Sequence, residues 1–126
     1  MWLECPKTDL RGVLLIAHPH PLYGGSMHNK VVHTLARAAL NQGLAALRFN
    51  FRGVGESDGE HDQGIGEQLD LLTVAAWIRT ELPEQPLLLA GFSFGARVAL
   101  LVEKEIGVEQ LILVAPPFRL HSDLWP

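Results

Sequence analysis

The stretch that decides the fold is LLLAGFSFGARVALL, residues 87–101, in which an apolar run leads into a serine held between two glycines. Its centre, residues 91–95, reads Gly-x-Ser-x-Gly with Ser93 in the middle. Residues 86–90 have the composition of a short buried strand, and residues 95–107 have that of a helix. A strand that turns directly into a helix is the setting in which such a serine acts as a nucleophile. We therefore predict that Ser93 is catalytic.

The residue types around Ser93 have a steric reason. A strand-to-helix turn is so tight that side chains two positions before and after the serine would collide with neighbouring backbone, and Gly91 and Gly95 have none. The small Ala96 keeps the start of the helix slim. The hydroxyl would then stand near the positive end of the helix, where developing negative charge is stabilised. The plainer alternative is a glycine-rich turn with a capping serine.

Outward from this turn, short apolar runs alternate with helical patterns. Ser26 is the expected N-cap of the first helix, and Gly43 follows its last turn. Strands that are apolar throughout and separated by helices indicate a mostly parallel sheet covered on both faces, a three-layer α/β sandwich. Strands are predicted at 12–18, 44–50, 86–90 and 110–117, and helices at 26–43, 66–82 and 95–107.

Composition narrows the class of protein. The chain has 126 residues, 48% of them hydrophobic and 19% charged, which is typical of one folded domain over residues 1–126. The formal net charge of −4, with scattered Lys and Arg, argues against nucleic-acid binding. The apolar runs are too short to span a bilayer, and the N-terminus does not resemble a secretory signal. With Cys5 as the single cysteine, we expect a cytoplasmic protein that needs no cofactor.

The segment AHPHPLYGG, residues 17–25, follows the first predicted core strand. It is expected on the same rim as Ser93, because the carboxyl ends of parallel strands meet there. Acyl transfer needs two backbone N–H groups aimed at the oxyanion, and one is predicted to come from Phe94. The prolines on both sides of His20 have no N–H. The backbone N–H of His20 is therefore the predicted second donor.

The histidines also allow a metal-binding interpretation. His18 and His20 stand two residues apart on extended chain and could share a face, but no third ligand follows at a recognisable spacing. A metal-dependent hydrolase is thus an alternative, and our prediction is that there is no metal site. His18 is expected to be a hydrogen-bonded structural histidine, whereas His61 and His121 stand in no motif.

The glycine-rich segment RGVGESDG, residues 52–59, does not fit a phosphate-binding loop. It lacks the Gly-Lys-Ser/Thr ending, and the carboxylates of Glu56 and Asp58 would repel a phosphate. We predict that Arg52 pairs with a local carboxylate and that the glycines permit a tight turn. This loop is therefore interpreted as architecture beside the site.

Taken together, the segments AHPHPLYGGSMHNKVV, LRFNFRGVGESDG, GFSFGARVAL and LILVAPP resemble the α/β-hydrolase superfamily, in the family's order. The nearest resemblance is to the small, lidless bacterial serine hydrolases related to dienelactone hydrolases and short-chain esterases. It covers nearly the whole chain. It implies cleavage of carboxylic ester or thioester bonds in small molecules through an acyl-enzyme on Ser93, with Phe94 and His20 as oxyanion donors.

The resemblance also marks a departure. In the family, a catalytic acid and then a histidine follow the serine on later strands. Here His121 and Asp123 come in the wrong order, and Glu103 and Glu105 fall at the far end of the serine's helix. We therefore expect the chain to be an N-terminal portion of a hydrolase, incomplete at its C-terminus.

Two further expectations follow from this departure. The alternative to an enzyme is a non-catalytic, hydrolase-like remnant that binds a ligand or a partner through the exposed rim. In addition, a last strand at residues 111–114 would leave a hydrophobic sheet edge unpaired, which favours formation of a homo-oligomer.

Overall fold

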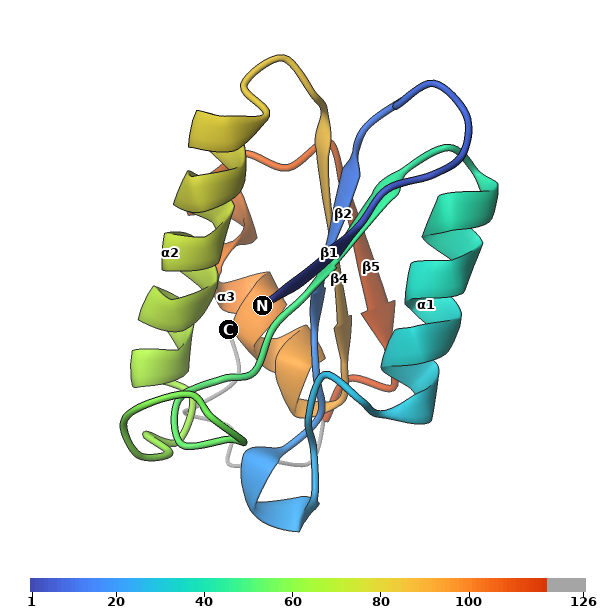
Figure 1. Cartoon of the computed structure of the whole chain (residues 1–126). Helices are drawn as coiled ribbons and strands as arrows, with labels where there is room; N and C mark the ends of the chain where they lie inside the picture. Colours follow the sequence, from blue (N-terminus) through green and yellow to red (C-terminus); the bar gives the residue numbers. More distant parts are fainter. Residues whose placement is uncertain (118–126) are drawn as a thin grey trace.

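A five-stranded sheet runs through the centre of the molecule in the computed structural model, which describes residues 1–117 (Figure 1). The strands are β1 (Trp2–Glu4), β2 (Val13–Ala17), β3 (Ala45–Arg48), β4 (Leu87–Phe92) and β5 (Gln110–Val114). The helices are α1 (Lys30–Asn41), α2 (Gly66–Glu81) and α3 (Phe94–Ile106), with a short 3₁₀ helix, η1 (Pro21–Tyr23).

The sheet is mostly parallel, as predicted. Its strand order is β1-β3-β2-β4-β5, and only the pair of β1 with β3 is antiparallel. The predicted core strands correspond to β2, β3, β4 and β5, whereas β1 was not predicted. Its three residues are exposed or half-buried, and the apolar run at the start of the chain already ends at Glu4, so pairing with β3 rather than a local pattern makes this segment a strand.

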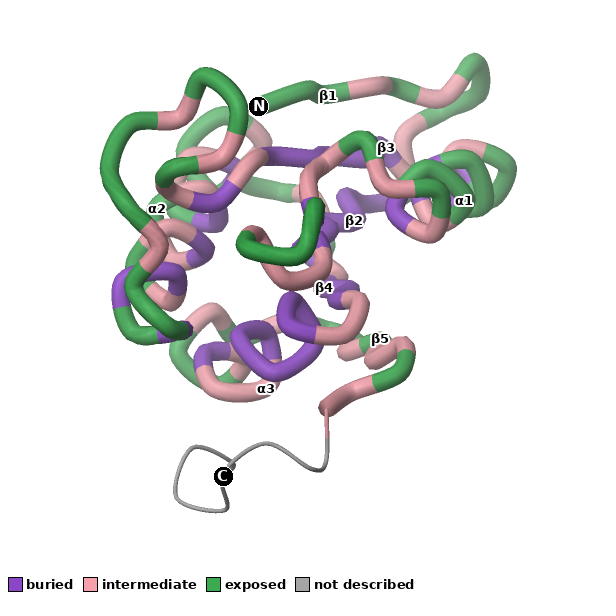
Figure 2. Tube along the Cα trace, turned by 90° about the horizontal axis from the view of Figure 1, so that it is seen from below, coloured by how far each residue is buried: buried purple, intermediate pink, exposed green. Residues whose placement is uncertain are grey.

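The three layers follow from the way in which the strands are buried. Helix α1 covers one face of the sheet, and α2 and α3 cover the other (Figure 1). Alternate residues of β2 point to opposite faces: Leu14 and Ile16 pack towards α1, and Leu15 packs towards α2 and α3. Burial on both faces explains why this strand is apolar throughout, and Figure 2 shows the buried strands enclosed between the helices. In the part of the chain described, no helix has both the length and the apolarity to cross a membrane.

The start of α1 differs from the prediction. Asn29, not Ser26, is the N-cap, and its Oδ1 accepts the N–H groups of the second and third helical residues at 2.8 and 3.3 Å. The Ser26 hydroxyl instead accepts the N–H of His28 at 3.1 Å, in the turn before the helix. At the other end the prediction is confirmed, because Gly43 adopts the left-handed conformation (φ 80°) just beyond the helix.

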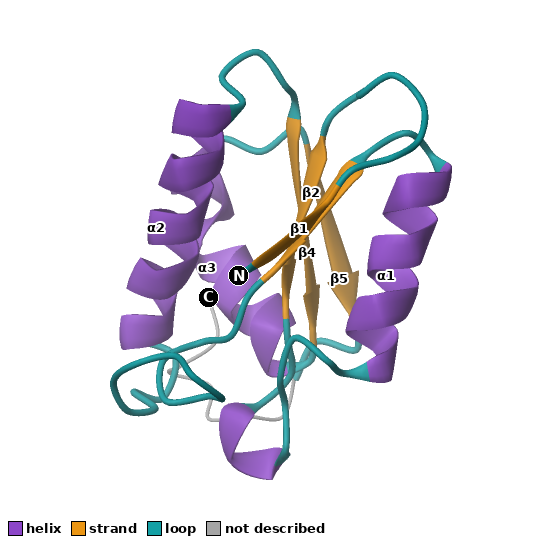
Figure 3. Ribbon diagram, viewed as in Figure 1, coloured by secondary structure: helices purple, strands orange, loops and turns teal. Residues whose placement is uncertain are grey.

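The segments that follow β2, β3 and β4 gather at one end of the molecule, the lower end in Figure 3. They are the loop that contains η1, the glycine-rich loop before α2, and the turn into α3. The carboxyl ends of parallel strands form the usual site crevice of such a sheet. The candidate residues are sought at this rim.

Candidate active site at the carboxyl ends of the strands

Ser93 is the single residue between β4 and α3. Its backbone angles, φ 56° and ψ −114°, lie in a sparsely populated region for a residue with a side chain. The turn is held on both sides: the Ser93 N–H donates to the Val114 carbonyl at 2.9 Å, and its carbonyl accepts the N–H groups of Ala96 and Arg97 at 3.0 and 3.2 Å. The residue is half-buried. The hydroxyl is thus presented by backbone geometry at the start of a helix.

Both glycines of the motif are required by close backbone contacts. A Cβ atom on Gly91 would lie 2.5 Å from the carbonyl oxygen of Gly95. A Cβ atom on Gly95 would overlap the carbonyl oxygens of Ala17 and His18, at the end of β2. The predicted steric reason for the two glycines is therefore confirmed. The contact with β2 also brings the first turn of α3 directly against the loop that contains His20.

This loop begins beside the Ser93 turn because β2 and β4 are neighbours, with Ala17 opposite Gly91. The rings of His20 and Phe94 are in contact, with their centroids 4.8 Å apart. Within residues 1–117, neither the His20 N–H nor the Phe94 N–H donates a hydrogen bond to the protein. The two residues predicted as donors are therefore brought together with their N–H groups unengaged.

The residues that follow His20 fold back onto it through hydrogen bonds. Its carbonyl accepts the N–H groups of Tyr23 and Gly25 at 3.1 and 2.9 Å, and its Nδ1 accepts the N–H of Leu22 at 3.2 Å. Burial lowers the pKa of His20, and electrostatic interactions with His61 and Arg97 lower it further. A neutral ring is required for this arrangement, because a protonated Nδ1 has no lone pair for the Leu22 N–H.

His18 is fully buried and uses both ring nitrogens within the protein. Nε2 accepts the N–H of Phe51 at 3.0 Å, so the proton is on Nδ1, which donates to the Pro19 carbonyl at 2.6 Å. Burial lowers the pKa of His18 to about 4. The prediction of a structural histidine is confirmed. His18 has no lone pair left for a metal ion, which counts against the metal-binding alternative.

Sequence reasoning missed a group of residues that packs against the predicted donors. The ring of His61, placed in no motif, lies 4.9 Å from that of His20 and 5.5 Å from that of Phe94. Its Nδ1 is 3.1 Å from a carboxylate oxygen of the fully buried Glu67. The guanidinium carbon of Arg97 lies 5.3 Å from the centre of the Phe94 ring. No local pattern connects these positions, because the loop before α2 brings them together.

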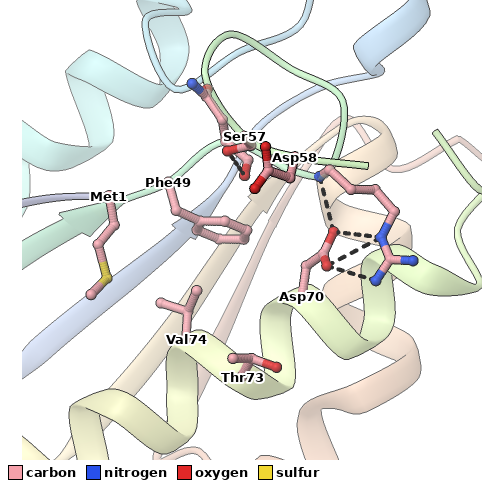
Figure 4. A pocket seen from close by; sticks show the side chains of 9 residues that line it. Met1, Phe49, Ser57, Asp58, Asp70, Thr73 and Val74 are labelled. Atoms are coloured by element: carbon pink, nitrogen blue, oxygen red, sulfur yellow. Dashed lines mark hydrogen bonds and ion pairs between the residues drawn. The ribbon is translucent and has the colours of Figure 1, made fainter. Parts of the chain in front are cut away.

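Arg52 pairs with a local carboxylate, as predicted. Its Nη2 lies 2.8 Å from Asp70 Oδ1, and its backbone N–H donates to Asp70 Oδ2 at 3.0 Å (Figure 4). The pair lines a hollow of about 300 Å³ that Phe49 and Asp58 also line and Ser93 does not. Because Asp70 satisfies both the side chain and the backbone of Arg52, the glycine-rich loop acts as architecture, tied to α2.

The carboxylates considered as catalytic acids lie away from Ser93. Glu103 and Glu105 are in the last turns of α3, at the end opposite the serine, as predicted. His121 and Asp123 lie outside the described residues. Within residues 1–117, the only histidine–carboxylate contact near the rim is that of His61 with Glu67.

A mostly parallel sheet, covered on both faces, whose serine stands between two glycines on a strand-to-helix turn, defines the class of α/β serine hydrolases. The chain belongs to the serine aminopeptidase S33 family, whose profile matches residues 8–126. An α/β serine hydrolase homologue from Coxiella burnetii is 48% identical, with a TM-score of 0.90 over 94% of this chain and 58% of that one. A lidless α/β serine hydrolase from Xanthomonas campestris is 45% identical, with a TM-score of 0.89 over 98% of this chain and 59% of that one.

Among curated relatives, an uncharacterised protein of Rickettsia prowazekii is 41% identical over 107 residues, which are 83% of this chain and 45% of the relative. The chain therefore spans about half the length of the relatives that it matches. The expected resemblance to small, lidless bacterial serine hydrolases is confirmed, and so is the correspondence to a portion of them.

Proposed function

We propose that the chain carries the nucleophile and the oxyanion-binding groups of a hydrolase that cleaves carboxylic ester or thioester bonds. Ser93 Oγ attacks the carbonyl carbon of the substrate, and the alcohol or thiol leaves while the acyl group remains on Ser93. Water then attacks this acyl-enzyme and releases the acid. No cofactor is needed for either step.

The observation that carries this proposal is the backbone of Ser93. A residue with a side chain adopts φ 56° and ψ −114° only where its surroundings impose that conformation. Here Gly91 and Gly95 allow the turn, and backbone hydrogen bonds on both sides hold it. Such a turn exposes a hydroxyl at the end of the sheet. Nucleophilic attack requires this exposure, whereas a serine that only caps a helix does not need it. In this structure the Ser93 side chain makes no cap hydrogen bond to α3.

The free N–H groups of His20 and Phe94 support an oxyanion-binding role. A tetrahedral intermediate places a negative charge on the former carbonyl oxygen, and preorganised N–H donors lower the energy of that state. The winding of the loop around His20 and the packing of its ring on Phe94 hold both donors before the substrate arrives. The N-terminal end of α3 adds a favourable dipole.

The substrate class rests on relatives as well as on the site. The lysophosphatidylserine lipase of mouse is 27% identical over 128 residues, 98% of this chain, and this likeness favours an ester over a peptide bond. We propose a small-molecule ester or thioester and a cytoplasmic setting. Partners among nucleic acids are not expected, given the net charge of −4.

The catalytic histidine and acid are proposed to lie in parts of the protein other than residues 1–117. His18 has both ring nitrogens engaged, and the Nδ1 of His20 accepts the Leu22 N–H. A serine hydroxyl without an adjacent base is a weak nucleophile. The 126-residue chain alone is therefore expected to give only the residual turnover that substrate binding and an oxyanion hole support.

The experiment compares hydrolysis of p-nitrophenyl acetate and of an acyl-coenzyme A thioester by the complete gene product and by its Ser93→Ala variant. The variant should fold normally, with turnover reduced to background. Ester hydrolysis retained in a folded Ser93→Ala protein would show that another residue is the nucleophile.

A further inference from the structure

Glu67, in the first turn of α2, is a fully buried carboxylate close to the candidate site. It accepts the N–H of Asp62 at 2.8 Å and that of Gly64 at 3.0 Å, and so holds residues 62–64, just before α2, in a closed turn. A charge removed from water in this way is strongly destabilising unless it is paired. The contacts of Glu67 therefore indicate the role of this buried carboxylate.

The first partner is His61. Its Nδ1 lies 3.1 Å from Glu67 Oε2, without the geometry of a hydrogen bond, so the imidazole ring and the carboxylate are in direct contact. The imidazole ring packs against the rings of His20 and Phe94. Glu67 thereby orients a ring that touches both residues whose backbone N–H groups face the substrate in the proposed function.

A second, indirect link runs to Arg97, which is also buried, through the turn at residues 62–64 that Glu67 holds. Its Nη2 donates to the Gln63 carbonyl at 2.8 Å, and its guanidinium group lies over the Phe94 ring. Burial lowers the pKa of Arg97, and the negative charge of Glu67 opposes that effect. A Cβ atom on Gly64 would overlap Nη2, so the loop closes tightly on the guanidinium group.

We propose that Glu67 is a positioning residue for the oxyanion-binding groups. Glu67 contacts His61 directly and holds the turn whose Gln63 carbonyl binds Arg97. His61 and Arg97 in turn pack against the side chains of His20 and Phe94, and this packing fixes the direction of the two backbone N–H groups. This inference rests on the proposed function, and it assigns the loop before α2 a role in the same site. Glu67 itself does not touch the substrate.

The test uses Glu67→Gln in the complete gene product, because glutamine keeps the size and one acceptor but removes the charge. Outright loss of one oxyanion donor lowers kcat by about 100-fold to 1,000-fold, and loosening of both is expected to lower it by about tenfold. KM for p-nitrophenyl acetate should be unchanged, since the oxyanion forms only in the transition state. A kcat within twofold of the wild-type value, or a loss confined to KM, would overturn the proposal.

The matched control is Asp70→Asn, one turn further along α2. It breaks the ion pair with Arg52, which is the one hydrogen-bond and ion-pair partner of the Asp70 carboxylate within residues 1–117. Thermal unfolding of both variants measures the general effect on stability. Equal kcat losses in the two variants would mean that Glu67 acts only through the stability of the fold, which contradicts the proposal.

His61 supplies an independent comparison. His61→Phe keeps a ring against His20 and Phe94, and it should retain several-fold more kcat than His61→Ala. If Glu67 acts partly through His61, the loss caused by Glu67→Gln should be smaller in the His61→Ala background than in the wild type. If the kcat losses of Glu67→Gln and His61→Ala were fully additive, and His61→Phe and His61→Ala were equally active, His61 would not transmit the effect of Glu67. That result would overturn the proposal.

Failure of the proposed function is distinguishable from failure of this inference. If the wild-type protein does not hydrolyse either substrate, the proposed function is wrong. The backbone amide resonances of His20 and Phe94 in ¹⁵N NMR spectra then still test whether Glu67 positions these two N–H groups. Glu67→Gln should shift or broaden both resonances, and Asp70→Asn should leave them in place. Unchanged resonances in Glu67→Gln would overturn the positioning role.

Discussion

His18 couples the stability of the fold to pH, because it is buried in the neutral form between β2 and the residues that follow β3. Its pKa is lowered from 6.5 in the unfolded chain to about 4 in the folded protein. Between these two values the unfolded chain binds more protons, so the stability contributed by neutral His18 is complete above pH 6.5 and is lost as the pH falls towards 4. The expected loss is about 3 kcal/mol.

This effect is measured by urea unfolding of the wild type and of His18→Asn between pH 7 and pH 4. The free energy of unfolding of the wild type should fall by about 3 kcal/mol more than that of the variant. His28→Asn, at an exposed position, serves as the control and should follow the wild type. Parallel profiles for the wild type and His18→Asn would contradict the assigned environment of His18.

His20 provides a test of a role carried by backbone rather than by side chain. His20→Ala and His20→Pro both remove the imidazole, but only proline also removes the N–H. The φ angle of His20, −55°, already suits proline. His20→Pro is therefore expected to lower the kcat of the complete gene product with about 3 kcal/mol of lost transition-state stabilisation, and His20→Ala should lose much less. Equal activity of the two variants would count against the oxyanion role.

At the scale of the elements, the start of α1 shows how a local rule is decided by a distant contact. Ser26 and Asn29 are both good N-caps by residue type. The chain remains a turn at residues 26–28 because Asn50, after β3, accepts the N–H of Met27 at 2.9 Å. The helix consequently begins after Asn29.

Because Asn29 and not Ser26 is the N-cap of α1, substitutions of the two residues should differ in their effect on stability. Asn29→Ala should lower the free energy of unfolding by about 1 kcal/mol, because two helical N–H groups lose their acceptor. Ser26→Ala should cost less, since its hydroxyl accepts one N–H in an exposed turn. Urea unfolding of the two variants measures the difference, and a larger loss for Ser26→Ala would restore Ser26 as the cap.

The difference between local sequence signals and contacts between distant residues also explains which features could be predicted from the sequence. Apolar runs and the glycines around Ser93 are local signals, and they identified the core strands, the helices and the serine turn. Strand β1 was missed because its three residues, two of them exposed, are too few to form a recognisable strand pattern. His61, Glu67 and Arg97 were missed because they meet at the rim only through the folded loop before α2, and spacing along the chain does not express that contact.

At the scale of the molecule, the outer edge of β5, which pairs with no other strand among residues 1–117, is the feature with the clearest consequence. In residues 1–117, β5 pairs with β4 alone, and Ile112 is 37% exposed. An exposed apolar edge favours pairing with another chain, so we expect the 126-residue chain to form homo-oligomers through it. Sedimentation velocity should show concentration-dependent association that Ile112→Lys reduces. A monomer at all concentrations, or equal association of the variant, would contradict this expectation.

The central claim for the whole molecule is that the fold presents Ser93 as its nucleophile. The measurement that tests it most directly is reaction of the complete gene product with a fluorophosphonate, followed by mass spectrometry of its peptides. We predict one adduct, on Ser93, and its loss in Ser93→Ala. A folded protein in which Ser93 remains unmodified, or in which Ser26 or Ser57 carries the adduct, would contradict the account.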